Sequence, residues 1–252
     1  MSDVVRYDVR RDAAWITLNQ PERRNALSEE VVAGLLDGLQ RAMAATTVRT
    51  IVITGAGTAF CAGADLKAGG IAGGSGDSPF VTLLKTIWNA PKPVVGRING
   101  HAFGGGVGLA AACDLTVAVD SATFSFSEVR IGVIPAMISV VVIPKLGVQQ
   151  AMWLFLTGER FTATRAVDLG LIHRAVPADM LDTAVDEIVG MVRLGGPTAV
   201  REAKQLVRQV PSMSMDDGFA HTARKIGELF ASEEAAEGMR AFVEKRKPHW
   251  AE

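Results

Sequence analysis

The sequence contains few cysteines and no strong bias of charge. Two cysteines occur among 252 residues, Cys61 and Cys113, and the net charge is −1. Two isolated thiols favour reduced, packed side chains over a disulfide framework, and the four scattered histidines show no metal-ligand spacing. Lys and Arg are dispersed along the chain, which argues against a basic surface for nucleic acid. We therefore expect neither a metal site nor a nucleic-acid partner.

Long apolar runs are also missing. No uninterrupted run approaches the roughly 20 residues that a membrane helix needs. Residues 1–6 lack both the apolar core of a secretion signal and an Arg-rich amphipathic leader. Hydrophobic residues make up 48% of the chain and charged residues 21%, as in globular proteins. We expect a cytoplasmic location, no membrane partner, and one large domain or one domain with an appendage.

Two glycine-rich segments each follow an apolar, strand-like run. Residues 50–54 lead into Gly55-Ala56-Gly57, and residues 93–98 lead toward Gly104-Gly105-Gly106, which opens an Ala-rich helical segment. The start of a helix carries unpaired N–H groups and a partial positive charge, and glycine lets a ligand oxygen approach them. Two such segments could direct two N–H groups at one oxygen, as in an oxyanion hole. A tight turn is the simpler explanation of either segment alone.

Two nucleotide-binding motifs fit these glycines poorly. In a dinucleotide fingerprint the third position requires Gly or Ala, and Phe60 occupies it here. No acidic residue ends a second strand at the required spacing. A Walker A loop is excluded because no Gly-Lys-Ser/Thr follows either glycine cluster.

The pattern along the chain predicts alternating strands and helices. We expect strands at residues 4–10 and 13–18 and a helix from Ser28, its N-cap, to residue 44. Further strands are expected near 50, 94 and 115–119, and this alternation favours parallel strands joined by right-handed crossovers. After residue 134 we expect helices, apart from an extended piece at 173–176. His101 and Asp114 are expected to make packing or backbone contacts.

Five segments together resemble a known family. They are residues 19–28 (NQPERRNALS), 60–66 (FCAGADL), 100–106 (GHAFGGG), 127–135 (SEVRIGVIP) and 230–248. In this order they resemble the successive motifs of the enoyl-CoA hydratase/isomerase, or crotonase, superfamily. The resemblance implies an α/β fold, a spiral of repeated ββα turns over residues 1–194, with a C-terminal helical trimerisation region at 195–252. It also implies a homotrimer or a hexamer, in which the amphipathic segment 214–247 would find a partner surface. No internal repeat is visible in the sequence.

The resemblance also implies a site for an acyl-CoA thioester. The thioester carbonyl would lie between the backbone N–H groups of Ala64 and Gly105, which stabilise an enolate. The implied contacts to substrate and CoA are Arg24, Ala26, Ala62, Asp65, Leu66, Lys67, Phe103, Pro135 and, from a neighbouring subunit, Lys245. The two lysines could equally be ordinary solvated charges. No cofactor is expected, since coenzyme A is part of the substrate.

One position departs from the family pattern. Hydratases of this family usually carry two glutamates that hold a water molecule. The second corresponds to Glu128, whereas Gly108 occupies the place of the first. Because glycine cannot activate water, we expect Glu128 to act as the acid and base, with the water held by another group. If the missing acid alone limits the reaction, Gly108→Glu should raise crotonyl-CoA turnover.

Three functions remain open. The first is hydration of a 2-enoyl-CoA, as in the branch that resembles methylglutaconyl-CoA hydratase, where the substrate could supply part of the missing charge. The second is double-bond isomerisation, for which one glutamate suffices. The third is binding of acyl-CoA with little turnover. Product masses distinguish the first two, because only hydration adds water.

Overall fold

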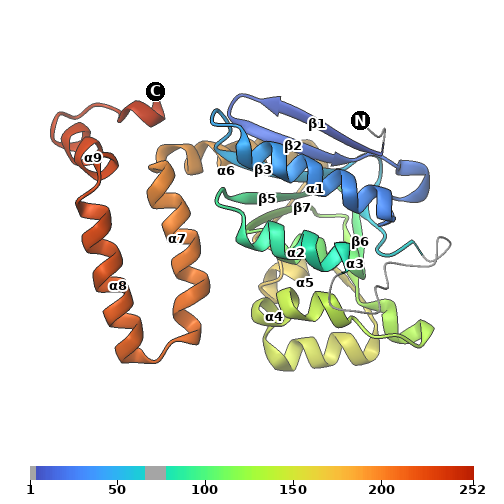
Figure 1. Cartoon of the computed structure of the whole chain (residues 1–252). Helices are drawn as coiled ribbons and strands as arrows, with labels where there is room; N and C mark the ends of the chain where they lie inside the picture. The colour runs from blue at the N-terminus through green and yellow to red at the C-terminus, as the bar shows by residue number, and fades with distance from the viewer. Residues whose placement is uncertain (1–3, 66–77) are drawn as a thin grey trace.

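The computed structural model describes residues 4–65 and 78–252, and its strands form two sheets (Figure 1). The larger sheet has the order β1-β2-β3-β5-β7-β10, and only β1 and β2 pair antiparallel. Its strands are β1 (Val5–Arg10), β2 (Ala13–Leu18), β3 (Thr50–Gly55), β5 (Val94–Ile98), β7 (Leu115–Val119) and β10 (Arg174–Val176). The smaller sheet contains β4 (Ala59–Cys61), β6 (His101–Phe103), β8 (Thr123–Ser125) and β9 (Arg160–Thr162), in that order. The α/β fold with parallel strands is therefore confirmed.

The repeat that the sequence hides is visible in the strand order. The pairs β3/β4, β5/β6 and β7/β8 each place their first strand in the larger sheet and their second in the smaller one. A helix follows each pair: α2 (Pro79–Asn89), α3 (Gly105–Ala112) and, after a 3-10 turn, α4 (Ala136–Thr157). The second strand of each pair is only three residues long, and the three helices differ widely in length and composition. That variation conceals the repeat in the sequence.

The central strands are apolar on both faces because helices cover the larger sheet. Ile51, Val52 and Ile53 in β3 are all fully buried, as parallel sheets require. Helix α1 (Glu29–Ala44) begins as expected, since the Ser28 hydroxyl accepts the Val31 N–H at 3.3 Å. Its inward face consists of Val31, Val32, Leu35, Leu39 and Ala42. The apolar core extends from α1 and the larger sheet through α2 and α3 to α4.

Helix α4 is the one helix in the described part of the chain whose length and composition would suit a membrane span. Its backbone leaves the helical conformation at Gly147, with φ 71° and ψ 162°. The break divides α4 into two shorter segments, neither long enough alone to cross a bilayer. Strand β9, which follows α4, lies where the sequence predicted helix.

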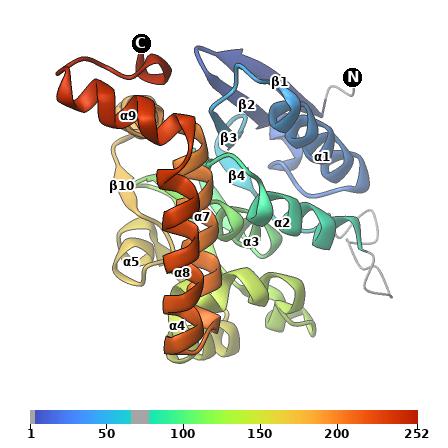
Figure 2. The same ribbon diagram turned by 60° about the vertical axis from the view of Figure 1, so that its left-hand side comes forward.

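The C-terminal helices extend from one side of this core (Figures 1 and 2). They follow α5 (Ala163–Asp168) and α6 (Leu181–Leu194), and are α7 (Pro197–Gln209), α8 (Met215–Phe230) and α9 (Glu233–Val243). Asp114, just after α3, fixes α7 to the core: its carboxylate accepts from Lys204 at 2.7 Å and from Arg208 at 2.5 Å. The same carboxylate accepts the Val94 N–H at 2.7 Å, which confirms its expected backbone contact.

Helices α8 and α9 expose a large apolar face. Phe219 is 70% exposed and Phe242 85%. The other exposed apolar side chains of the two helices are Met215, Ile226, Phe230, Met239 and Val243.

Helix α6 ends at Leu194 and α7 begins at Pro197. The division at residue 195 stays a prediction.

Candidate functional site

The first segment of the site, residues 61–65 downstream of Gly55-Ala56-Gly57, is fixed against Leu27. The Leu27 N–H donates to the Gly63 carbonyl at 2.7 Å, and the Asp65 N–H donates to the Leu27 carbonyl at 3.1 Å. Leu27 thus forms a parallel bridge with Ala64. In a parallel bridge the flanking peptide groups make the bonds, so the N–H of Ala64 itself points away from Leu27. The backbone donor expected at Ala64 is therefore held in one orientation.

The second segment meets the first at the start of α3. Gly104 is the N-cap, with φ 50° and ψ −118°, and its N–H donates to the Ser125 carbonyl at 3.0 Å. The N–H of Gly105 belongs to the first turn of α3, which has no intrahelical acceptor. A Cβ atom on Gly63 would lie 3.3 Å from the Gly105 nitrogen and 2.7 Å from the Phe103 carbonyl oxygen. The structure thus brings Ala64 and Gly105 together, and Gly63, which the sequence analysis did not assign, makes this approach possible.

Two asparagine side chains hold the loops beneath these segments. Asn25 is fully buried and its amide donates to the Ala59 carbonyl at 2.8 Å. The Asn99 amide donates to the carbonyls of Gly57 at 2.9 Å and Ala59 at 3.2 Å, and its oxygen accepts the Gly55 N–H at 3.0 Å. These bonds connect the loops that follow β2, β3 and β5. They satisfy backbone groups that the irregular chain would otherwise leave unpaired.

Glu128 lies directly beside this meeting point. It belongs to the 3-10 turn Ser127–Ile131, and a Cβ atom on Gly104 would lie 3.1 Å from its Oε1 atom. Its Oε2 atom is buried and has no hydrogen-bond partner within the described chain. Burial raises the pKa of this carboxyl group, and a hydrogen bond from its own backbone partly opposes that increase. The one acid that the family pattern assigns is thus half-buried at the start of α3.

The position of the missing glutamate is occupied by a neighbouring side chain. A Cβ atom on Gly108 would lie 2.1 Å from Cγ2 of Ile138 and 2.7 Å from its Cβ. Ile138, in the first turn of α4, is 3% exposed. A glutamate cannot replace Gly108 without displacing Ile138, and the gain expected from Gly108→Glu stays a prediction.

Four predicted CoA contacts gather beside the first segment. The Ala62 N–H donates to the Arg24 carbonyl at 3.0 Å, and Ala26 lies in the same turn. Arg24 is exposed and has φ 53°, in the left-handed region. Asp65 is buried and its carboxylate forms an ion pair with Arg23. Asp65 therefore stabilises this turn, and its contact with CoA stays a prediction.

Phe103 and Pro135 lie on either side of Glu128 in the sequence. The Phe103 ring stacks on His101, with centroids 6.0 Å apart, and the guanidinium of Arg160 lies 5.4 Å from the Phe103 centroid. His101 also accepts the Thr123 N–H at 3.1 Å, which confirms the packing and backbone contacts expected for it. Pro135 is buried and is the N-cap of α4.

Leu66 and Lys67, two further predicted contacts, lie outside the described residues. Within the described part of the chain, no group of three or more His, Cys, Asp or Glu side chains is placed to hold a metal ion. The thiols of Cys61 and Cys113 are both buried, and burial raises the pKa of each to about 12. Neither thiol is a reactive thiolate at neutral pH.

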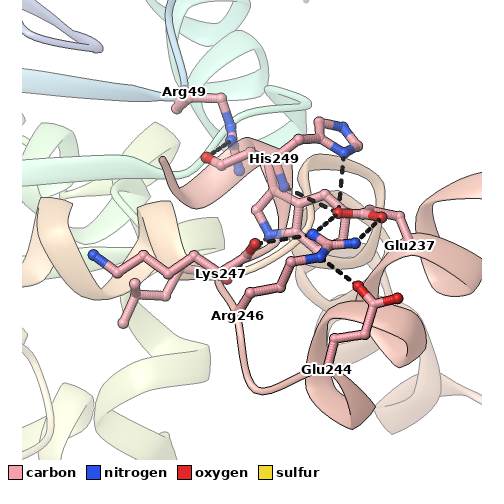
Figure 3. A network of polar contacts seen from close by, with 8 residues as sticks. Arg49, Glu237, Glu244, Arg246, Lys247 and His249 are labelled. Atoms are coloured by element: carbon pink, nitrogen blue, oxygen red, sulfur yellow. Dashed lines mark hydrogen bonds and ion pairs between the residues drawn. The ribbon is translucent and has the colours of Figure 1, made fainter.

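Lys245 directly precedes Arg246, whose ion-pair network Figure 3 shows. Both residues follow α9, and Lys245 has φ 52°. Arg246 binds both carboxylate oxygens of Glu237, at 2.6 and 2.9 Å, and its Nε binds Glu244 at 2.7 Å. These bonds lower the pKa of Glu237 to about 2. Figure 1 places α9 at the far end of the molecule from α3, so a contact from Lys245 would have to reach another copy's site.

Comparisons with known proteins show which family this sequence and fold resemble. Residues 9–252 match the sequence profile of the enoyl-CoA hydratase/isomerase family. A Thermus thermophilus protein named as an enoyl-CoA hydratase is 36% identical over 244 residues, covering 94% of this chain and 96% of that protein. The crystal structure of an enoyl-CoA hydratase/isomerase from Marinobacter aquaeolei has 33% identity, a TM-score of 0.92 and full coverage of both chains. Pseudomonas aeruginosa AtuE has 34% identity and a TM-score of 0.92, covering 99% of this chain and all of that one.

Proposed function

The chain belongs to the enoyl-CoA hydratase/isomerase family, and we propose that it adds water to a 2-enoyl-CoA thioester through a single carboxyl group, that of Glu128. One observation carries this proposal. A Cβ atom on Gly104 would lie 3.1 Å from Oε1 of Glu128, and the next residue, Gly105, has its nitrogen 3.3 Å from an added Cβ on Gly63. A substrate whose thioester oxygen is bound by the N–H groups of Ala64 and Gly105 therefore has its α- and β-carbons close to the Glu128 carboxylate.

The main chain supplies the electrostatic part of the reaction. The N–H groups of Ala64 and Gly105 would donate to the thioester oxygen, where negative charge develops as the enolate forms. Fixed backbone donors need no reorganisation during the reaction, and they leave the side chains free to select the acyl group. Coenzyme A is part of the substrate, and the proposal includes no further cofactor.

One carboxylate can carry out both proton transfers. Glu128 removes a proton from water as the water oxygen bonds to the β-carbon, and the electrons of the double bond move onto the thioester oxygen. The neutral carboxyl group then returns that proton to the α-carbon, and the enolate collapses to the thioester. Water is added across the double bond and the carboxylate is regenerated. Burial moves the pKa of Glu128 upward, toward neutral pH, which suits a group that both accepts and donates a proton.

Double-bond isomerisation is the second candidate. It needs the same oxygen-binding donors and one base that moves a proton along the acyl chain. The apolar contact of Ile138 with Gly108, where a second acid would lie, favours such a one-base reaction. Both functions therefore depend on Glu128, and they differ only in whether water is incorporated.

Purified protein should be incubated with crotonyl-CoA, 3-methylglutaconyl-CoA and a 3-enoyl-CoA, and the products read by mass. Hydration adds the mass of one water, whereas isomerisation leaves the mass unchanged. Glu128→Gln should lower turnover by about a hundredfold or more, the usual scale for loss of a general acid and base, and should retain affinity for the thioester. Glu187→Gln, at an exposed glutamate on α6, is the matched control.

The outcomes separate the candidates. Addition of water that is lost in Glu128→Gln supports the proposed hydratase. A change of double-bond position without added mass replaces it with the isomerase. CoA-ester binding without any product would leave an acyl-CoA-binding protein and overturn both. Unchanged turnover in Glu128→Gln would place the acid elsewhere.

A further inference from the structure

We propose that Ile138 determines which acyl groups the site accepts, by forming the wall that faces the substituents of the substrate β-carbon. This inference rests on the proposed function, because it assumes that the thioester binds at the start of α3. Ile138 lies outside the glycine segments and the acid already described. Among the glycines of α3, Gly108 has the closest side-chain neighbour. A Cβ atom added to Gly108 would lie 2.1 Å from Cγ2 of Ile138.

The position of Ile138 follows from one turn of helix. The Gly108 N–H donates to the Gly104 carbonyl at 3.1 Å, so the two glycines lie one turn apart. Glu128 covers Gly104, and Ile138 covers Gly108. The carboxylate and the isoleucine therefore occupy successive positions along the start of α3. A substrate whose carbonyl lies at Gly105 and whose α-carbon meets Glu128 directs its next substituents toward Ile138.

The wall is both apolar and stiff. A β-branched side chain in a helix has one strongly preferred χ1 rotamer, and Ile138 is 3% exposed in the first turn of α4. It cannot move aside without disturbing its packing against α3. An acyl substituent too large for the space beside Ile138 is then excluded. A charged acyl substituent facing Ile138 would find no polar partner there. The glycine at 108 is required because the isoleucine takes the space of its side chain.

The first experiment tests the contact by stability alone. Gly108→Ala should lower the melting temperature, because its methyl group overlaps Ile138. Combining it with Ile138→Gly should restore part of that loss, so that the double variant is more stable than the sum of the single effects predicts. If Gly108→Ala is as stable as the wild type, or if the two changes are simply additive, the contact is not the one described and the proposal fails.

The second experiment tests selectivity. Ile138→Ala should raise kcat/KM for 3-methylcrotonyl-CoA relative to crotonyl-CoA by about tenfold, the scale that a methyl-sized change in an apolar pocket produces. Ile188→Ala is the matched control, since Ile188 is 5% exposed and lies on α6. It should leave the ratio unchanged. A ratio that stays constant in Ile138→Ala, or that changes equally in Ile188→Ala, overturns the proposal.

Failure of the proposed function would be distinguishable. If the wild-type protein converts neither thioester, the hydratase proposal fails, and dissociation constants for the same two thioesters then test the wall. Relative affinity for the branched ester should rise in Ile138→Ala and not in Ile188→Ala. Equal relative affinities in both variants would overturn the role of Ile138 independently of turnover.

Discussion

At the scale of single residues, Gly105 offers a test of the backbone donor. Gly105→Pro removes the N–H, and proline is tolerated at the first position of a helix. Gly105→Ala adds a similar Cβ, 3.0 Å from the Leu27 side chain, but keeps the N–H. We expect the proline variant to turn over about a hundredfold more slowly than the alanine variant, as for loss of one oxyanion-hole donor. Equal steady-state rates for the two folded variants would mean that the thioester oxygen binds elsewhere.

Glu128 should also leave a signature in stability. Its raised pKa means that the folded state favours the neutral acid, so folding loses free energy as pH rises from the ordinary glutamate value through the raised one. The side chain of glutamine carries no charge at any pH in this range. We therefore expect Glu128→Gln to melt at a higher temperature than the wild type near pH 8, with the difference disappearing near pH 4. A constant difference across that range, measured by calorimetry, would show that burial does not disfavour the charge.

The sequence analysis assigned candidate site residues that lie within short motifs. Gly105 and Glu128 were found because their neighbours along the chain carry the pattern. Leu27, which orients Ala64, and Ile138, which covers Gly108, were missed because each acts on a residue far from it in sequence. Contacts of that kind depend on how α3 and α4 pack, and no local spacing encodes them.

At the scale of elements, Asp114 determines how α7 attaches. Lys204 and Arg208 of α7 converge on its carboxylate, with side chains 6% and 13% exposed. Asp114→Asn keeps an acceptor for the Val94 N–H but leaves two largely buried cations without their counter-charge. We expect a loss of about 3 kcal/mol in the free energy of unfolding, measured with urea. Glu187→Gln breaks an exposed pair with Arg174 and should cost less than about 0.5 kcal/mol. Similar losses in both variants would contradict the role of Asp114.

Elements with strong local signals were predicted well. The strands at 5–10 and 13–18 and the helix begun by Ser28 lie close to the expected bounds. Strand β9 was missed because its three residues form a strand only by pairing with β8. The break at Gly147 was also missed, although Pro144 and Gly147 are a local signal for it. Short elements such as β9 depend on their neighbours more than on their own residues.

At the scale of the whole molecule, the exposed apolar face of α8 and α9 predicts self-association. Exposing an apolar patch that contains Phe219 and Phe242 to water is unfavourable in free energy. By resemblance we expect a trimer or hexamer, which would also bring Lys245 to a neighbouring site. Light scattering at micromolar concentration should give at least three chains, and Phe219→Asp with Phe242→Asp should reduce that mass. Val9→Asp, on the edge strand β1, is the control. A fully active monomer would remove the predicted contact from Lys245.

The hydrogen bonds of Asn99 have a chemical consequence. Asn99 precedes Gly100, and Asn-Gly peptides are prone to deamidation because the following amide nitrogen attacks the side-chain amide. Here that side chain is engaged with Gly55, Gly57 and Ala59 and cannot reach the required geometry. Folding thus protects the Asn99 side-chain amide, which would deamidate readily in an unfolded chain. Each excursion to the unfolded state exposes it, so heat inactivation should become irreversible as Asn99 converts to an acid, detectable by peptide mass mapping.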